Sequence, residues 1–600
     1  MIKNILCVPL DPVHDVGLKI IKNALQNNGH KVNLLIPDLS MEEIVKYALA
    51  EKYDFILVSR TLGYGVYELL AKFIDMCDAA GVRDNSKMVI GGKPITPQLA
   101  AELGFDKGFS SSTTIEEVVA YVEGKEITSD MQQFKKVKRK FVDEHSYEFY
   151  HKGIKKSLDT IAGKFIKWAD ARTSAGVERA ELMRNFIRSN KKDKVLFDKY
   201  LELCDDEIRQ GNTGEKALKG VRVITEEELI NLNNYLENKN HYQPIKIQHD
   251  KRHPLIFKFL GSGCPILDIV HGKICERWGT DGFLLINPSW EARYEGLLHD
   301  YLTHQNDGTI TSLENISLIK KYLLDGTFLT VRAHRGLNTP ETTMLAGEAG
   351  ADMTKINLVY GSLGAGTDPE RLGVDGLAAI KYAAEYGMPF DIPGNDELSG
   401  VPAYKTLAGL LINVMIGLHA GAKPIPKPLF CYGPHIMING QMNKNYVDYN
   451  YAKIEALRAI ADMPIWPGEP IAFMTQSEER VQSANATSYH ASLAAFLGVD
   501  AITIASTDEA YSRGPICIAS RIDSLRAVQD AFKFIGNTNI DTTTDCDKFT
   551  DEMIDNIDNV LEAVAAEENL PQAIYKGLLG NKEEDGAYPG TFGRGTIRCR

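Results

Sequence analysis

The stretch NILCVPLDPVHDVG, residues 4–17, sets an apolar run directly before a loop that carries a histidine. Residues 4–8 have the length and character of a buried strand, and residues 16–28 have helical periodicity. His14 therefore lies between a strand and a helix, above the carboxyl end of the predicted sheet. Gly17 lets that helix begin close beneath a large planar ligand. This arrangement suits His14 as an axial metal ligand.

The alternation of short apolar runs with helical segments continues to about residue 125. It predicts a parallel, doubly wound sheet of the flavodoxin-like (Rossmann-like) α/β class in a domain of residues 1–125. Further strands are expected at 31–35, 55–58 and 88–90, and further helices at 41–51, 67–80 and 115–122. Ligands of such sheets bind where the strands end.

Small residues follow two of these strands. Ser59-Arg60-Thr61-Leu62-Gly63 comes after one strand, and Gly91-Gly92 comes after the next. Small side chains at successive strand ends leave a slot for a long, flat group.

Together, His14…Gly17, Ser59…Leu62 and Gly91-Gly92 resemble the base-off, His-on cobalamin-binding domain of mutases and corrinoid methyltransferases. Residues 80–109 are especially similar to that domain in glutamate mutase and in lysine and ornithine aminomutases. The resemblance implies that His14 binds cobalt, that Ser59 contacts the dimethylbenzimidazole tail and that the glycines line its channel. The implied cofactor-binding set is Asp11, His14, Gly17, Ser59, Leu62, Gly91 and Gly92.

The sequence departs from the family pattern at one position. The family places an aspartate two residues before the histidine, but Pro12 stands there and Asp11 lies three residues before His14. A carboxylate on the second imidazole nitrogen raises the basicity of a metal-binding histidine. Either Asp11 reaches round the proline or Asp15 takes this role.

The remainder of the chain predicts three further parts. Residues 126–245 are charged and helical and form a linker module, and residues 541–600 form a C-terminal extension whose glycine-rich stretch 586–595 is an exposed arm or a subunit contact. Residues 246–540 have the size and pattern of a (β/α)8 TIM barrel, in which chemistry takes place on the loops after the strands. Its eight strands are expected at 255–260, 282–286, 328–332, 353–359, 389–392, 429–432, 471–474 and 501–505.

Segments 287–296 and 329–336 resemble the catalytic subunit of glutamate (methylaspartate) mutase. The resemblance implies that Arg335 binds a substrate carboxylate and that His334 and Tyr360 line the same cavity as catalytic residues. The substrate-binding set is Arg293, Arg335, Asn357 and His435. Residues 261–263 lack the arginine of the family, and no equivalent of its catalytic glutamate stands near Lys355. We therefore expect a substrate that differs from glutamate by lacking the amino group.

These resemblances predict an adenosylcobalamin-dependent isomerase, a carbon-skeleton mutase of a small carboxylic acid such as glutamate or 2-methyleneglutarate. One alternative is an aminomutase that also needs pyridoxal phosphate, with Lys355 as the Schiff-base lysine. Another is a corrinoid methyl-transfer protein.

Bulk properties restrict the partners. A net charge of −13 argues against a nucleic-acid ligand, which needs a concentrated basic surface. The sequence has no apolar run long enough to span a membrane and no Cys-x-x-Cys pair for a zinc or iron–sulfur site. We expect a cytoplasmic homo-oligomer.

Overall fold

The computed structural model divides into two compact units. The first comprises residues 1–135 with 234–247, and the second comprises 136–233 with 248–600. The structure describes residues 2–63, 65–111, 113–125, 138, 140–209, 225–237, 254–261, 264–285, 312–333, 337, 339–363, 366–394, 397, 400–430, 446–468, 480–504, 518–535, 541–581, 584 and 589–600. Among the described helices, none combines the length and apolar character needed to cross a bilayer.

The first unit is built on a five-stranded parallel sheet with strand order β2-β1-β3-β4-β5. This is the predicted α/β fold, and four of its strands were predicted within two residues at each end. The fifth was not predicted, because it has only three residues and begins with a lysine. The strands are β1 (Asn4–Pro9), β2 (Lys31–Leu34), β3 (Phe55–Ser59), β4 (Lys87–Gly91) and β5 (Lys107–Phe109).

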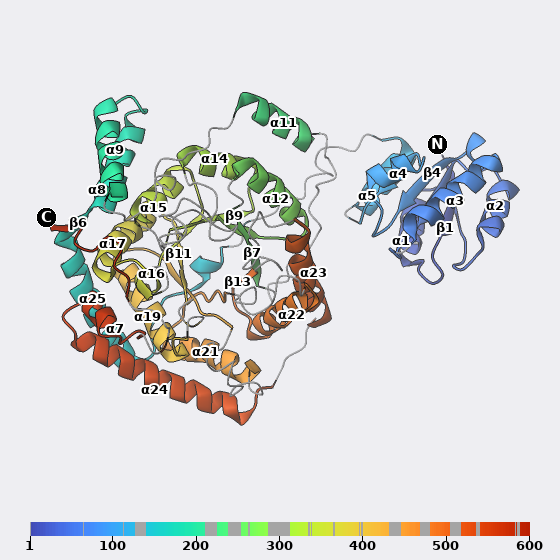
Figure 1. Ribbon diagram of the computed structural model, residues 1–600. Helices are drawn as coiled ribbons and strands as arrows, with labels where there is room; N and C mark the ends of the chain where they lie inside the picture. Colours follow the sequence, from blue (N-terminus) through green and yellow to red (C-terminus); the bar gives the residue numbers. More distant parts are fainter. Residues whose placement is uncertain are drawn as a thin grey trace. The chain divides into compact units, whose positions relative to one another are not determined.

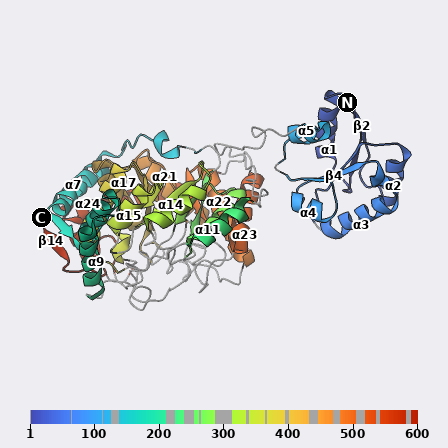
Figure 2. The ribbon, with the colours of Figure 1, turned by 90° about the horizontal axis from the view of Figure 1, so that it is seen from above.

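Helices cover both faces of this sheet (Figure 2). On one face, α1 and α5 bury Leu18, Leu25 and Val118 against the strands. On the other, α2, α3 and α4 contribute a second apolar cluster that includes Phe73. Capping boxes at Ser40 and Thr114 begin α2 and α5 by satisfying the first free backbone N–H groups. The helices are α1 (Val16–Asn27), α2 (Met41–Ala50), α3 (Val66–Ala79), α4 (Pro97–Glu102) and α5 (Ile115–Glu123).

The second unit contains a seven-stranded parallel sheet with strand order β12-β11-β10-β9-β8-β7-β13. In Figure 1 its strands lie inside a ring of helices. The strands are β7 (Leu255–Leu260), β8 (Gly282–Leu285), β9 (Phe328–Arg332), β10 (Met353–Lys355), β11 (Phe390–Pro393), β12 (Pro424–Lys427) and β13 (Ala501–Ile504).

Six of the eight predicted barrel strands coincide with β7–β11 and β13, although β10 is shorter than predicted. The strand predicted at 429–432 is β12, which begins five residues earlier; Leu429 makes an isolated parallel bridge to Gly468, and residues 431–432 lie outside the described residues. Pro424 and Pro426 hid β12, since proline lacks the N–H of a strand residue and is rare inside sheets. The strand predicted at 471–474 lies outside the described residues.

A segment at residues 465–468 hydrogen-bonds to both edges of this sheet. Toward β12, Trp466 N donates to Pro426 O at 3.1 Å and Gly468 N donates to Pro428 O at 2.8 Å. Toward β13, Asp500 N donates to Ile465 O at 3.1 Å. The two outer strands of the sheet are thus bridged by one segment of chain, and the sheet is strongly curled.

The inner face of the curled sheet is apolar at its amino end. Phe257, Phe328, Met353 and Trp466 pack there in one buried cluster, which Phe141 of the preceding segment joins. The Phe257 and Trp466 rings lie 4.1 Å apart. Since strand side chains alternate between faces, residues two positions along from these also point inward.

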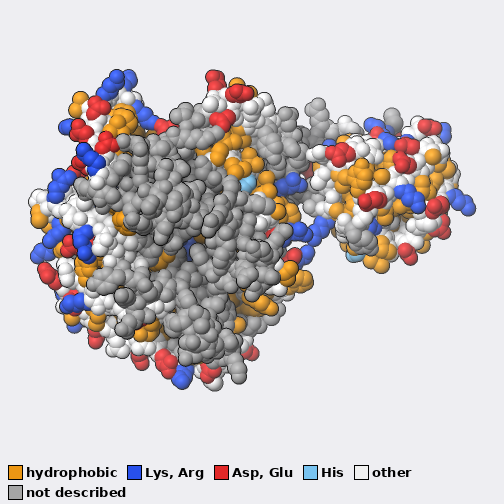
Figure 3. All heavy atoms as spheres, in the orientation of Figure 1, with side chains coloured by type: hydrophobic (Ala, Val, Ile, Leu, Met, Phe, Trp, Pro, Cys, Tyr) orange, Lys and Arg blue, Asp and Glu red, His pale blue; other side chains and the backbone are white. Residues whose placement is uncertain are grey.

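Helices surround the sheet of the second unit. They are α12 (Pro265–Arg277), α14 (Leu313–Tyr322), α15 (Thr339–Glu348), α16 (Tyr360–Leu363), α17 (Pro369–Glu385), α19 (Ala403–His419), α21 (Tyr446–Ile460), α22 (Arg480–Leu497), α23 (Ile518–Ile535), α24 (Thr544–Ala566) and α25 (Leu570–Tyr575). On the face shown in Figure 3, acidic and basic side chains are interspersed over the described surface.

Most described elements of the predicted linker pack within the second unit. They are α7 (Lys152–Asp170), β6 (Arg172–Ser174), α8 (Ala175–Arg188) and α9 (Lys194–Arg209), followed by α11 (Glu226–Glu237). Helix α7 contacts α19 and α24, and β6 pairs antiparallel with β14 (Ile597–Cys599). In the glycine-rich stretch, the described residues 589–595 are not a free arm, since Gly593 is buried near Arg371.

Candidate functional site

The first candidate site lies at the carboxyl end of the first sheet, on the loop after β1. The Asp11 side chain is fully buried. Its carboxylate accepts hydrogen bonds from Thr61 N at 2.6 Å, Leu62 N at 3.2 Å and Arg60 Nη1 at 3.2 Å. Arg60 Nη1 also donates to Leu10 O at 2.9 Å. Asp11 therefore ties the His14 loop to the loop after β3.

His14 lies on the outer part of the same loop and is exposed. Within the described part of the chain, no hydrogen bond or ion pair engages its imidazole. The apolar side chains of Val13 and Val16 flank it and are 69% and 66% exposed. Asp15 stands just before α1 and pairs with Lys19 at 2.8 Å. The imidazole is thus presented to a ligand beside apolar surface.

A cavity of about 190 Å³ opens next to this loop. Its wall combines glycines and small hydroxyl side chains with the apolar side chains of the core. The lining residues include Gly17, Ser59, Thr61, Gly91, Gly92, Ser110 and Thr113. Four predicted residues thus lie together in one wall, while Leu62 contributes its backbone N–H to Asp11.

Gly92 is required by the close approach of two chain segments. Its φ is +145°, and a Cβ atom there would lie 1.8 Å from Arg60 O. Any larger residue would push the loop after β3 away from β4. Gly91 is less restricted, since its Cβ would meet Phe109 at an ordinary 3.6 Å.

The site fits cobalamin. An exposed histidine at the strand ends can bind the metal, the apolar rim matches a flat macrocycle, and the cavity receives a long side group between helix and sheet. Among the described residues, no group of three His, Cys, Asp or Glu side chains gathers to hold a metal by itself. His14 is therefore suited to a metal that arrives with its own ligands.

In the second unit, four of the predicted residues lie outside the described residues: Arg293, His334, Arg335 and His435. Two are placed, and both are buried. Asn357 Nδ2 donates to Pro393 O at 2.6 Å, and its Oδ1 accepts from Val359 N and Tyr360 N. Asn357 thus links the end of β10 to β11 and begins α16, in which Tyr360 is the first residue.

Four strands of the second sheet carry buried charged side chains that are not among the predicted site residues, although Lys355 is the Schiff-base lysine of the aminomutase alternative. They are Arg332, Lys355, Asp391 and Lys427, each at most 6% exposed. Lys427 Nζ lies 3.1 Å from Asp391 Oδ2, and Lys355 Nζ lies 4.0 Å from the same oxygen. The sequence did contain a signal, since β9, β10 and β12 each end in a basic residue.

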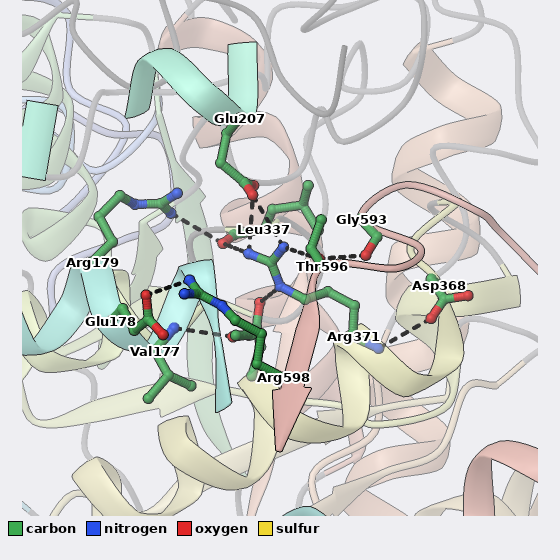
Figure 4. Close-up of polar contacts among 12 residues, drawn as sticks. Val177, Glu178, Arg179, Glu207, Leu337, Asp368, Arg371, Gly593, Thr596 and Arg598 are labelled. Carbon is green, nitrogen blue, oxygen red and sulfur yellow. Dashed lines mark hydrogen bonds and ion pairs between the residues drawn. The ribbon is translucent and has the colours of Figure 1, made fainter. Parts of the chain in front are cut away.

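A buried ion network fixes the chain just beyond β9 (Figure 4). Arg179 Nη2 and Arg371 Nη2 both donate to Leu337 O, at 3.0 and 3.3 Å. Arg371 also pairs with Glu207 and donates to Thr596 Oγ1 at 2.8 Å. Two guanidinium groups thus hold the residue that lies two positions after the predicted Arg335.

Comparison with known proteins defines the class of the first unit. The model of the B12 binding domain matches residues 3–119. The glutamate mutase sigma subunit of Carboxydothermus hydrogenoformans is 36% identical over 117 residues, which are 18% of this chain and 82% of that subunit. Through this domain, the chain belongs to the B12-binding family that includes the glutamate mutase sigma subunit.

Other relatives match over the same region. The lysine 5,6-aminomutase beta subunit of Fusobacterium nucleatum is 30% identical over 120 residues, 18% of this chain and 46% of that subunit. Dimethylamine corrinoid protein 1 of Methanosarcina acetivorans is 32% identical over 98 residues, 16% of this chain and 44% of that protein. The chain thus spans less than half the length of these two relatives.

Proposed function

We propose that this protein is an adenosylcobalamin-dependent mutase, a carbon-skeleton isomerase of a small carboxylic acid. The first unit binds the cofactor and the second unit binds and rearranges the substrate. One observation carries the proposal. The same chain contains a B12-binding domain and a curled parallel sheet, and buried charged residues lie at the strand ends of that sheet.

We further propose that the second sheet closes as a (β/α)8 barrel, with the segment 465–468 as part of its seventh strand, between β12 and β13. Its hydrogen bonds to both outer strands support this closure, and so does the inward apolar cluster. A closed barrel collects the ends of all strands around one cavity, where enzymes of this fold carry their active sites.

In the first unit, His14 would bind the cobalt, and the cavity beside Ser59, Gly91 and Gly92 would receive the nucleotide tail. Adenosylcobalamin supplies a carbon-centred radical that can take a hydrogen atom from an unactivated carbon. Asp11 keeps the His14 loop in place through its three hydrogen bonds.

In the second unit, the role of the protein is to bind, orient and exclude water. Arg335 and Arg293 would bind substrate carboxylates, because a guanidinium group pairs with a carboxylate through two parallel hydrogen bonds. His334, Tyr360, Asn357 and His435 would complete the cavity wall. Burial of the site protects reactive species from water.

An aminomutase is the second candidate, because the lysine 5,6-aminomutase beta subunit is among the relatives. It would require pyridoxal phosphate on a lysine, and the candidate is Lys355, the last residue of β10. The matched corrinoid protein also suggests a methyl-transfer role. That role would not explain the buried charges at the strand ends of the second unit.

The test is anaerobic reconstitution of the full chain with adenosylcobalamin, with and without pyridoxal phosphate. We expect a base-off, His-on spectrum that His14→Ala abolishes and that His419→Ala, at an exposed histidine of the second unit, leaves unchanged. Glutamate or 2-methyleneglutarate should then induce a paramagnetic signal without pyridoxal phosphate. A signal that needs pyridoxal phosphate identifies an aminomutase instead, and a failure to bind cobalamin refutes both.

A further inference from the structure

Lys427 and Asp391 form a buried pair inside the second sheet. Lys427 Nζ donates to Asp391 Oδ2 at 3.1 Å and lies 4.0 Å from the centre of the Trp466 ring. Lys427 is 2% exposed, and Asp391 is fully buried. Lys427 is the last residue of β12, at the end of the sheet where barrel enzymes bind their substrates, and Asp391 is the second residue of the neighbouring strand β11.

This pair has unused hydrogen-bonding capacity. An ammonium group has three N–H donors, and among the described residues Lys427 has one oxygen acceptor and one aromatic face. Asp391 Oδ1 has no hydrogen-bond partner in the part of the chain that the structure describes. Proteins rarely leave a buried carboxylate oxygen unsatisfied, because its lost hydration is not recovered. A donor next to Asp391 and an acceptor next to Lys427 would satisfy both groups.

The electrostatics favour an anion as that acceptor. Burial lowers the pKa of Lys427, while the neighbouring Asp391 carboxylate opposes this effect. Lys355 Nζ is 4.0 Å from Asp391 Oδ2, so two ammonium groups approach a single carboxylate oxygen. An additional negative charge beside Lys427 therefore stabilises its protonated form.

We propose that Asp391 and Lys427 bind a small acid that carries a hydrogen-bond donor next to its carboxylate, namely a 2-amino or 2-hydroxy acid. The carboxylate accepts from Lys427, and the ammonium or hydroxyl group donates to Asp391 Oδ1. This inference rests on the proposed function and selects a glutamate-like substrate over a 2-methyleneglutarate-like one. It reverses the expectation, based on the missing arginine, that the substrate lacks an amino group.

The test measures binding to the full cobalamin-loaded chain by calorimetry, with L-glutamate, L-2-hydroxyglutarate and glutarate as probes. Glutarate has the same carboxylates but no donor at carbon 2. We expect the first two acids to bind at least ~10-fold more tightly than glutarate, as for a hydrogen bond to a charged group. This comparison needs no variant, so it does not depend on the folding of a mutant.

Variants then assign the preference to residues. Asp391→Asn should remove the preference for L-glutamate over glutarate, and Lys427→Met should weaken both acids by ~10-fold or more. Lys258→Met is the matched control, because Lys258 is equally buried but bonds to Ser524 of helix α23, outside the sheet. It should leave the affinities for both acids unchanged.

Two results overturn the proposal: equal or absent binding of the three acids by the wild-type chain, or a preference that persists in folded Asp391→Asn. The failure of the proposed function is seen separately, in the cobalamin spectrum. If the chain prefers L-glutamate but does not bind cobalamin, the acid-binding site is supported and the mutase function is refuted.

Discussion

Replacement of Asp11 should strongly destabilise the first unit. Its buried carboxylate accepts from the backbone of Thr61 and Leu62 and from Arg60, which is itself 3% exposed. Asp11→Ala removes the carboxylate that pairs with the buried Arg60 guanidinium. Removal of one partner of a buried pair costs about 3–5 kcal/mol. That loss is a large part of the stability of a small domain, so the variant should unfold much more easily.

Thiol labelling that is read at Cys7 and Cys77 by peptide mass mapping can follow the unfolding of this unit alone, because the other seven cysteines lie in the second unit. Cys7 and Cys77 are both in its core, and burial raises the pKa of each thiol to about 12, so they react only after unfolding. With a urea m value of roughly 2 kcal/mol/M, the midpoint for labelling Asp11→Ala should fall by about 2 M. Tryptophan fluorescence gives an independent signal from the second unit, because the four tryptophans are at 168, 278, 290 and 466.

The matched control is Asp15→Ala, since among the described residues Asp15 pairs with the exposed Lys19 alone and makes no side-chain cap. Its midpoint should change little, because exposed ion pairs contribute under about 1 kcal/mol. The double variant Asp11→Ala with Arg60→Met should be more stable than Asp11→Ala alone. Equal midpoints for Asp11→Ala and Asp15→Ala would refute this account of the loop.

Two other perturbations give independent tests. Gly92→Ala places a Cβ atom 1.8 Å from Arg60 O, and we expect at least ~10-fold weaker cobalamin binding in a spectral titration. In the second unit, burial alone would lower the pKa of His145, but hydrogen bonds with Asp500 and Asp462 raise it to about 9. The stability that the charged His145 contributes, about 1–3 kcal/mol, is complete below about pH 6.5 and is lost as the pH rises through 9.

The controls for these perturbations come from the same units. Gly63→Ala should leave cobalamin binding unchanged, because a Cβ there meets nothing within 4 Å. Urea midpoints from tryptophan fluorescence at pH 6 and pH 9.5 measure the effect of His145, and His145→Gln should reduce the difference between them. An unchanged pH dependence in this variant would mean that other groups carry it.

The fold of the first unit could be predicted because each of its longer strands is an apolar run between clear helical segments. Strand β12 was misplaced because a Pro-Ile-Pro-Lys sequence does not resemble a strand, although the tertiary structure makes it one. Local pattern also misses β5, whose three residues become a strand only by pairing with β4.

The candidate sites show the same limit. Motif spacing found the residues that line the cavity, since glycines and small hydroxyl residues stand out after strands. It could not show that Asp11 bonds to Arg60, because this contact joins positions 49 residues apart. Lys427 was not selected because Pro424 and Pro426 hid the strand that it ends.

The pairing of β6 with β14 bears on the order in which the protein matures during synthesis. Residues 172–174 find their partners only at 597–599, so the second unit cannot complete this pairing until more than four hundred further residues have been translated. The five strands of the first unit, in contrast, are all made by residue 109. A nascent chain could therefore fold its B12-binding domain on the ribosome well before the second unit is finished.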